Sequence, residues 1–432
     1  MAFIVAFIFC ALIFITKMLR LNHTAKWFLI CFQVIWGIVL LGSTYQPYGL
    51  YLPSDYTYTL LILNVVCFSC GIYITSYSRE KRSDFTVETI EHQIRALAEN
   101  RIYQIVIIIA CGFSLFYFAK FMSAMALSSN LGEIRSQFYD QGLYGSSYGF
   151  VSGLFLTPVQ IITFPVAAYC CLYRRSWIVI PMLLFLICNN SLSGGRFGYV
   201  KIFYSFLFIV LCIKSLNAKR LISLSVLGCI VFLGLSYVTS ARSDLSGSVA
   251  DKIESGIDET MRSISTYACG ATVAFDKSLE QRYTEKIGGH AYGAITGASV
   301  VQVAYIISNK LGAPFNQPLE RLTKYKQDRY INVGQGIRFN ALYTAVLYFY
   351  LDFGLFGVIV LPLLFGCICG WLIKKLLRYR NIYFLIIVNF CFILSMFSIT
   401  DFNFTTYTPL LVMFVLYYFG TRAKHKNRLS SR

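Results

Sequence analysis

Runs of about 20 apolar residues recur along the whole length of this chain, and about 20 residues is what an α-helix needs to cross the hydrocarbon core of a membrane. Of the 432 residues, 57% are hydrophobic and only 13% are charged, which is too little polar surface for a soluble domain. A transmembrane β-barrel would instead show short segments of alternating polarity, which this sequence lacks. The sequence therefore predicts an all-α, polytopic integral membrane protein.

The apolar runs predict eleven membrane spans. The first run, "AFIVAFIFCALIFIT", has no basic segment before it and no small-residue cleavage site, so we expect a retained span and not a signal peptide. We expect one membrane domain over residues 1–432, in which the long connection 240–338 lies outside and caps an outward-facing cavity. The predicted spans are 2–16, 27–45, 58–77, 102–122, 150–173, 177–193, 199–213, 221–239, 353–373, 382–399 and 406–420.

The lysines and arginines are distributed unevenly between the two sides. One alternating set of connections, together with the C-terminal tail, holds more than half of the 38 lysines and arginines. The opposite short connections hold only Arg135 and Arg196, with Lys120 and Lys201 just inside neighbouring spans. The positive-inside rule then places the N-terminus outside and the C-terminus in the cytoplasm. This topological signal and attraction to anionic lipid account for most of the net charge of +18, so nucleic acid is not an expected partner.

The stretch "NNSLSGGRFGYVKIFYS" places basic residues where the sixth predicted span ends and the seventh begins. A cation at the membrane edge is energetically expensive and often functional, and arginine binds phosphate through two parallel hydrogen bonds. Arg242 follows the eighth span at a similar depth, while Arg135 and Arg338 lie at the membrane ends of two outer loops. General contact with lipid phosphates is the simpler alternative for any one of them. The predicted lipid-diphosphate site comprises Arg196, Arg242, Lys201, Arg135 and Arg338.

Three residues on the predicted outer side are candidates for acid–base chemistry. His290 is the only histidine outside, and it stands in the Gly-flanked segment "KIGGHAYG". Asp352 opens the ninth predicted span, and Asp401 lies in the last outer turn. Each can activate a hydroxyl group, but a loop histidine is often merely solvated and the carboxylates can simply pair with the arginines. We predict His290 as the base, with Asp352 as the second candidate.

The sequence gives no indication of a metal or a cofactor. No D-x-D motif is present to hold a divalent cation on a diphosphate, so guanidinium groups would have to stabilise that charge. Most of the 14 cysteines lie in or beside apolar spans, where they behave as small hydrophobic residues. No Gly-rich nucleotide-binding loop follows a strand, which argues against an ATP-driven pump.

Three further segments carry structural predictions. The amphipathic stretch "VADKIESGIDETMRSI" predicts a helix on the outer membrane surface. Residues 291–312 are more apolar and fit a re-entrant or interfacial helix, or a span if 341–351 supplies another. Gly366 and Gly370 form a G-x-x-x-G motif, which predicts a helix-packing face.

The order of these features resembles the O-antigen polymerase (Wzy-type) family of oligosaccharide repeat-unit polymerases. The resemblance rests on "SLSGGRFG" at a span end, "SAR" before the long outer loop, and "FNALYTAVLYFYLDFGLFGVIVLPLLFGCICG" from Phe339 to Gly370. Within the last run, the similarity to the family lies in the spacing of Asn340, Thr344, Asp352 and the two glycines that follow, Gly354 and Gly357. The resemblance covers the chain from about residue 100 to its end.

The resemblance implies a membrane glycosyltransferase of the bacterial inner membrane. Such an enzyme takes oligosaccharide repeat units on undecaprenyl diphosphate at the outer face, joins them and releases undecaprenyl diphosphate. By position, Arg196 and Arg242 match the arginines that hold the lipid diphosphate in this family, and Arg135 and Arg338 match less closely. A regulator of chain length is a further expected partner.

Other functions remain open from the sequence. An O-antigen ligase would share the spans, the long outer loop and a loop histidine, although the region from Asp352 to Gly357 favours the polymerase. A repeat-unit flippase or other transporter would show repeated halves and polar residues near the middle of its spans. A membrane O-acyltransferase with a cytoplasmic acyl donor would favour functional residues on the inner face, where the loops are mainly basic turns.

Overall fold

A computed structural model gives the structure of the chain. It describes residues 1–77, 87–127, 146–173, 176–192, 197–213, 249–313, 315–328, 330–339, 343–402 and 406–429, together with the single positions 222, 225 and 228. These residues divide into two compact units, which we describe separately. The first unit comprises Met1–Asp84, Arg262–Arg378 and Leu394–Leu411, and the second comprises Phe85–Met261, Tyr379–Ile393 and Val412–Arg432.

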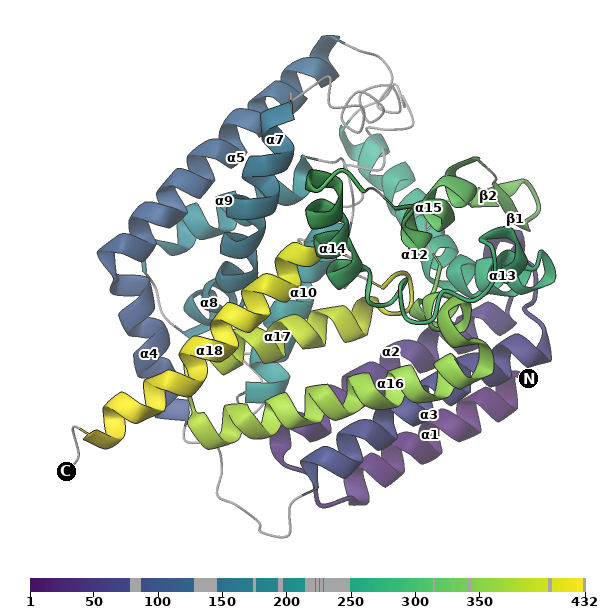
Figure 1. Ribbon diagram of the computed structural model, residues 1–432, viewed down its shortest axis with the longest axis horizontal. Coiled ribbons are helices and arrows are strands. Elements are labelled where there is room, and N and C mark those ends of the chain that lie inside the picture. The colour runs from purple at the N-terminus through teal and green to yellow at the C-terminus, as the bar shows by residue number, and fades with distance from the viewer. Residues whose placement is uncertain are drawn as a thin grey trace. The chain divides into compact units, whose positions relative to one another are not determined.

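The described part of the chain is almost entirely helical, as Figure 1 shows, and five of its helical segments are long and apolar enough to cross a membrane. This confirms an all-α protein with membrane-spanning helices. The five segments are His23–Thr44, Asp55–Ser76, Arg101–Ala124, Tyr148–Tyr173 and Ala345–Tyr379.

Other predicted spans correspond to shorter or different elements. Four further apolar helices of 10–17 residues coincide with predicted spans: Ala2–Met18, Val179–Ser191, Gly198–Leu211 and Ile382–Phe397. The last predicted span lies largely within α18 (Tyr407–Leu429), while 221–239 lies outside the described residues apart from the three positions 222, 225 and 228. The predicted number of eleven spans therefore stays a prediction.

The first unit is built on three N-terminal helices and a long C-terminal one. They are α1 (Ala2–Met18), α2 (His23–Thr44), α3 (Asp55–Ser76) and α16 (Ala345–Tyr379), with the single turn η1 (Pro47–Gly49) between α2 and α3. A buried polar network ties the first three together: the Thr16 hydroxyl contacts Gln33 and Tyr73, and the Gln33 amide donates to Ser69. Hydrogen bonds of this kind are common between helices in a membrane.

The predicted G-x-x-x-G packing face is confirmed. Gly366 and Gly370 of α16 lie against α3, so closely that a side chain at Gly366 would collide with the Phe68 backbone and one at Gly370 with Thr75. From the other side, a side chain at Gly71 of α3 would collide with the α16 backbone. Figure 1 shows the two helices side by side. Small residues thus let two backbones approach to contact, which maximises dispersion attraction where lipid offers no hydrophobic drive.

The predicted long outer connection is itself structured. It contains α12 (Val249–Glu280), α13 (Tyr283–Lys286), α14 (Ala298–Lys310), α15 (Pro318–Asp328) and the antiparallel hairpin of β1 (Ile331–Gly334) and β2 (Ile337–Phe339). The amphipathic stretch lies within α12, so its helix is confirmed and its place on the membrane surface stays a prediction. Helix α14 has 13 residues and is therefore only about 20 Å long, too short to span a membrane.

Two contacts attach this region to the N-terminal helices within the first unit. The hairpin extends onto the α2–α3 connection, because the Tyr51 N–H donates to the Val333 carbonyl and the Gln335 N–H donates to the Gly49 carbonyl, both at 2.9 Å. In addition, the buried Asp276 carboxylate of α12 accepts hydrogen bonds from the hydroxyls of Ser54 and Thr57 at the start of α3. The region is thus fixed to one end of α3.

The second unit consists of a group of helices in which α5 packs along α9. Hydrogen bonds between its helices include one from the N–H of Ile382 to Gln93 of α4 at 2.8 Å and one from the Ser205 hydroxyl of α10 to Asn389 at 3.1 Å. Its elements are α4 (Val87–Glu99), α5 (Arg101–Leu127), α7 (Ser146–Val151), η2 (Ser152–Leu156), α8 (Thr157–Tyr173), α9 (Val179–Ser191), α10 (Phe197–Phe208), η3 (Ile209–Ile213), most of α17 (Ile382–Phe397) and much of α18.

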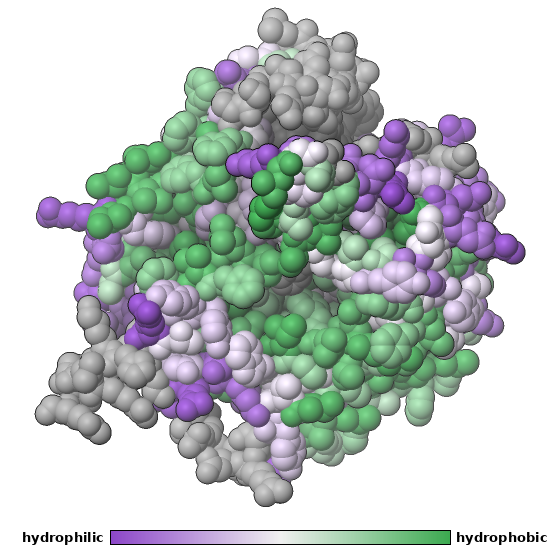
Figure 2. All heavy atoms as spheres, viewed as in Figure 1, coloured by the Kyte–Doolittle hydropathy of each residue, from purple (hydrophilic) through white to green (hydrophobic). Residues whose placement is uncertain are grey.

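Large apolar side chains cover the outer sides of both units. On α5 these include Ile102, Ile105 and Ile108, and on α16 they include Phe356 and Leu364, each at least half exposed. Figure 2 shows hydrophobic side chains over the regions of α5 and α16, and hydrophilic ones around α13 and the hairpin. A surface of this kind is stable in contact with lipid, which supports a membrane-embedded protein.

Candidate functional site

The loop that carries His290 is glycine-rich and follows the short helix α13. Gly288, Gly289 and Gly293 adopt φ values of +94°, +104° and +89°, which L-residues with a side chain rarely adopt. The sequence "GGHAYG" can therefore turn sharply on both sides of the histidine before α14 begins at Ala298. The turns leave the imidazole of His290 exposed.

The loop is bound to a break in helix α16. Phe353 (φ −141°, ψ 19°) and Gly354 (φ 59°, ψ −141°) leave the helical conformation, so the α-helical hydrogen bonds are interrupted at this point. The carbonyls just before the break accept from the loop instead: the Ala291 N–H donates to Leu351 and the Tyr292 N–H donates to Asp352, both at 3.1 Å. The ninth predicted span therefore begins with a short helical segment at Ala345, not at the predicted residue 353.

The carboxylate of Asp352 completes this attachment. It is fully buried, and one oxygen accepts from the Ile295 N–H at 3.0 Å while the other accepts from the N–H and the hydroxyl of Thr296, the N–H at 2.8 Å. Both oxygens thus have donors from the loop. Asp352, predicted as the second candidate base, has no exposed surface from which to meet a substrate, and its contacts favour a role in positioning the loop.

His290 itself is oriented by a backbone carbonyl. Its Nδ1 lies 3.3 Å from the carbonyl oxygen of Leu351. A carbonyl can only accept, so this contact favours the tautomer with the proton on Nδ1 and a free lone pair on Nε2. The other side of the ring faces Gly354, where a Cβ would lie 3.3 Å from Cε1 of the imidazole. The glycine therefore serves both the backbone break and the space for the ring.

His290 and Asp352 were predicted separately from sequence, and the structure brings them together at the end of α16. The basic residues are distributed differently. Arg338 is exposed on β2 in the first unit, and Lys201 is partly buried in α10 of the second unit. The remaining predicted members of the diphosphate site lie outside the described residues: Arg135, Arg196 and Arg242.

A second polar cluster in the first unit has a member that sequence reasoning missed. Lys326 of α15 is only 8% exposed, and its Nζ lies 3.4 Å from the hydroxyl of Tyr348. That hydroxyl donates to Asp401 at 2.6 Å. Because the amphipathic segment "RLTKYKQDRY" is typical of a solvated helix, its sequence carries no signal that one lysine is buried.

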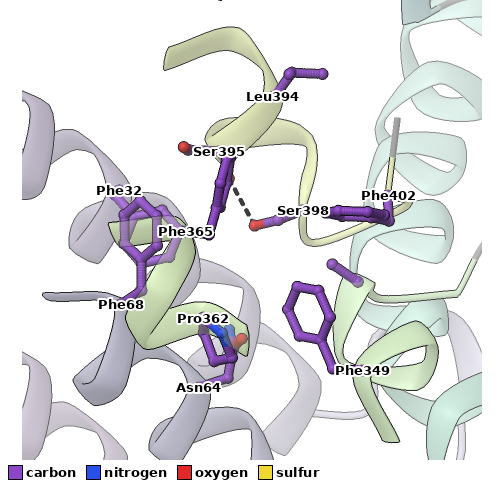
Figure 3. A pocket seen from close by; sticks show the side chains of 11 residues that line it. Phe32, Asn64, Phe68, Phe349, Pro362, Phe365, Leu394, Ser395, Ser398 and Phe402 are labelled. Carbon is purple, nitrogen blue, oxygen red and sulfur yellow. Dashed lines mark hydrogen bonds between the residues drawn. The ribbon is translucent and has the colours of Figure 1, made fainter. Parts of the chain in front are cut away.

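The first unit also contains a small cavity among aromatic rings. Figure 3 shows Phe32, Phe68 and Phe365 on one side, facing Phe349 and Phe402 across Ser398. Its free space fits about one water molecule and is too small for a sugar ring. Among the described residues, no group of three histidine, cysteine or acidic side chains is arranged to hold a metal ion.

Comparison of the chain with protein-family models, with curated proteins and with solved structures found no match.

Proposed function

We propose that this chain is a membrane glycosyltransferase that polymerises surface polysaccharide. In this proposal it joins oligosaccharide repeat units carried on undecaprenyl diphosphate, at the outer face of the bacterial inner membrane. The proposal combines the resemblance in sequence with the membrane-spanning helices and with one feature of the site, the arrangement of His290.

The observation that carries the proposal is an exposed imidazole that a backbone carbonyl orients at the break in helix α16. Nδ1 of His290 is within hydrogen-bonding distance of the Leu351 carbonyl, and the loop is fixed by five further hydrogen bonds to Leu351 and Asp352. A general base needs a free lone pair and a fixed direction, and both follow from this geometry. A histidine that was merely solvated in a loop would need neither a free lone pair nor a fixed direction.

In the proposed reaction, Nε2 of His290 takes the proton from a hydroxyl group of the acceptor repeat unit. The oxygen then attacks the anomeric carbon of the donor, and the bond from that carbon to the phosphate oxygen breaks. Undecaprenyl diphosphate leaves with the bonding electron pair. Arg196 and Arg242 hold this diphosphate in the proposal, and they stabilise the negative charge that develops on it.

Asp352 acts through the loop in this mechanism. Its carboxylate holds the Ile295–Thr296 backbone, and the adjacent carbonyls hold Ala291 and Tyr292 on the other side of the loop. Removal of the charge by Asp352→Asn would leave the N–H of Ile295 or of Thr296 facing an NH₂ donor, whichever way the amide is oriented. Asp352 is therefore a positioning residue in the proposal and His290 the catalytic residue.

The test is the surface polysaccharide of a strain that lacks this chain, separated on a gel. Loss of the ladder, with lipid core plus a single repeat unit left, is the result expected for a polymerase. Loss of all surface units while polymer accumulates on the lipid carrier would identify a ligase. Unpolymerised units trapped on the cytoplasmic face would identify a transporter, and an unchanged ladder with altered mobility a modifying enzyme.

Complementation of that strain tests the role of His290. We expect wild-type chain and His92→Ala to restore the ladder, because His92 is exposed on α4 in the second unit. We expect His290→Ala to restore none or little of it at equal protein level, since loss of a general base lowers rates by roughly 100- to 10,000-fold. A full ladder with His290→Ala would refute the assignment of the base.

A further inference from the structure

Lys326 is a buried cation with only one hydrogen-bond partner for its ammonium group among the described residues. An ammonium group has three N–H donors, and burial without partners is costly. Among the described residues, Nζ of Lys326 has one oxygen within reach, the Tyr348 hydroxyl at the long distance of 3.4 Å. Its other close neighbour is the ring of Tyr343, whose centroid is 4.3 Å away. At least one N–H therefore remains for a further acceptor.

Asp401 is the complementary group. One of its carboxylate oxygens accepts from the Tyr348 hydroxyl at 2.6 Å and from the Phe402 N–H at 2.8 Å. The second oxygen has no donor within the part of the chain that the structure describes. Lys326 and Asp401 make no direct ion pair there, because the Tyr348 hydroxyl lies between them. Within the described part of the chain, one unused donor on Lys326 and one unused acceptor on Asp401 thus lie on either side of the Tyr348 hydroxyl.

The charges of the cluster restrict what can bind. A phosphate or carboxylate would be attracted by Lys326 but repelled by Asp401. A cation would be attracted by Asp401 but repelled by Lys326. A hydroxyl group suits both, because it can accept from the ammonium and donate to the carboxylate at once.

The cluster lies close to the proposed catalytic loop. Tyr348 and Asp352 are four residues apart on the first segment of α16, which places them on the same side of the helix and about 6 Å apart along its axis. Tyr348 holds the cluster and Asp352 holds the His290 loop, both in the first unit. A disaccharide with one ring bound at the cluster is therefore long enough to place its other ring at the proposed catalytic loop.

We propose that Lys326, Tyr348 and Asp401 form a sugar-binding subsite that holds a hydroxyl-bearing ring of the acceptor repeat unit. The inference rests on the proposed function, because it assigns an acceptor to that same active site. Lys326 donates to a ring hydroxyl, Asp401 accepts from it, and Tyr348 keeps the two charges apart. The subsite determines which sugar is accepted and takes no part in the bond-forming step.

The test uses the full chain in lipid nanodiscs and a polymerisation assay with lipid-linked repeat units isolated from the source strain. Rates are measured against acceptor concentration at saturating donor for wild type, Lys326→Met, Asp401→Asn and the control Lys324→Met, which removes an exposed lysine of the same helix. We expect the acceptor KM to rise roughly tenfold or more in the first two variants, since hydrogen bonds to charged groups contribute about 1.5–3 kcal/mol. We expect kcat to change little, and the control to match wild type.

A second measurement covers the case in which those variants fold poorly. Tyr348→Phe removes a single hydroxyl and keeps the ring, and binding of the free repeat-unit oligosaccharide is followed by saturation-transfer NMR. We expect weaker binding than in wild type. Unchanged acceptor KM and unchanged binding in all variants would overturn the subsite while the polymerase remained. A wild-type chain that binds the oligosaccharide without polymerising would overturn the proposed function and leave the subsite standing.

Discussion

Replacement of Lys326 by methionine should change how the stability of the chain depends on pH. Burial lowers the pKa of Lys326 from its ordinary 10.5 to about 8, although the nearby Asp401 acts in the opposite direction. The unfolded chain therefore binds more protons than the folded chain between about pH 8 and 10.5. Stability must rise with pH across this window, because deprotonation removes the cost of a buried charge.

The size of the effect follows from the shift in pKa. A difference of one pKa unit corresponds to about 1.4 kcal/mol, so the buried ammonium of Lys326 destabilises the folded chain by about 3 kcal/mol below pH 8. Most of this cost is absent at pH 10. Methionine has a similar length and no charge, so the stability of Lys326→Met should lack the pH-dependent contribution of the buried ammonium group. Wild type should gain about 2.5 kcal/mol relative to Lys326→Met between pH 7 and pH 10.

The assay is chemical unfolding in mixed micelles at pH 7 and at pH 10. The difference between wild type and variant is the informative quantity, because all other titrating groups cancel in it. Lys324→Met serves as the control, since this lysine is exposed on the same helix and should show no such difference. An equal free-energy difference at both pH values would refute the buried, poorly solvated lysine on which the subsite depends.

Three other predictions concern the proposed catalytic loop, the proposed diphosphate site and the predicted topology. Gly354→Ala should cost about 1–3 kcal/mol of stability by backbone strain and lower polymerisation by crowding His290. Gly112→Ala, at an open position inside α5, should leave the ladder unchanged and keep or slightly raise stability, because alanine favours a helix more than glycine does. Arg196→Ala should abolish the ladder at an unchanged protein level. Arg196→Lys should restore the ladder poorly, because lysine cannot make the two parallel hydrogen bonds of a guanidinium group. Full activity of Arg196→Ala would show that this residue is not part of the site. A cysteine at Ser248 should react with an impermeant thiol reagent in intact spheroplasts, and reaction only after permeabilisation would reverse the orientation.

Hydropathy and small residues were the most informative parts of the sequence. The run of apolar residues predicted α2, α3 and α5 to within a few residues, because a lipid-facing helix needs both length and continuous apolarity. The contact face of Gly366 and Gly370 was also predictable, since few other motifs allow two backbones to touch.

The sequence suggested candidate residues for the site but not their geometry. His290 and Asp352 were selected because both lie on the predicted outer side, while their connection depends on the helix break at Phe353 and Gly354. Hydropathy does not reveal such a break, because it reports how apolar a segment is and not which backbone conformation it adopts. Lys326 was missed for another reason: its neighbours in sequence are polar, and only tertiary packing buries it.

The order in which the first unit is synthesised has a consequence for its assembly. The α2–α3 connection pairs with β1, and α3 packs on Gly366, but these partners are made roughly 250 residues or more after α3 itself. At a synthesis rate of about 5–20 residues per second, α1–α3 therefore wait in the membrane for about 10 seconds to a minute. During that time the Gly71 face and the backbone groups of Tyr51 lack their native partners. A chain cut after α3 would thus be an incomplete unit.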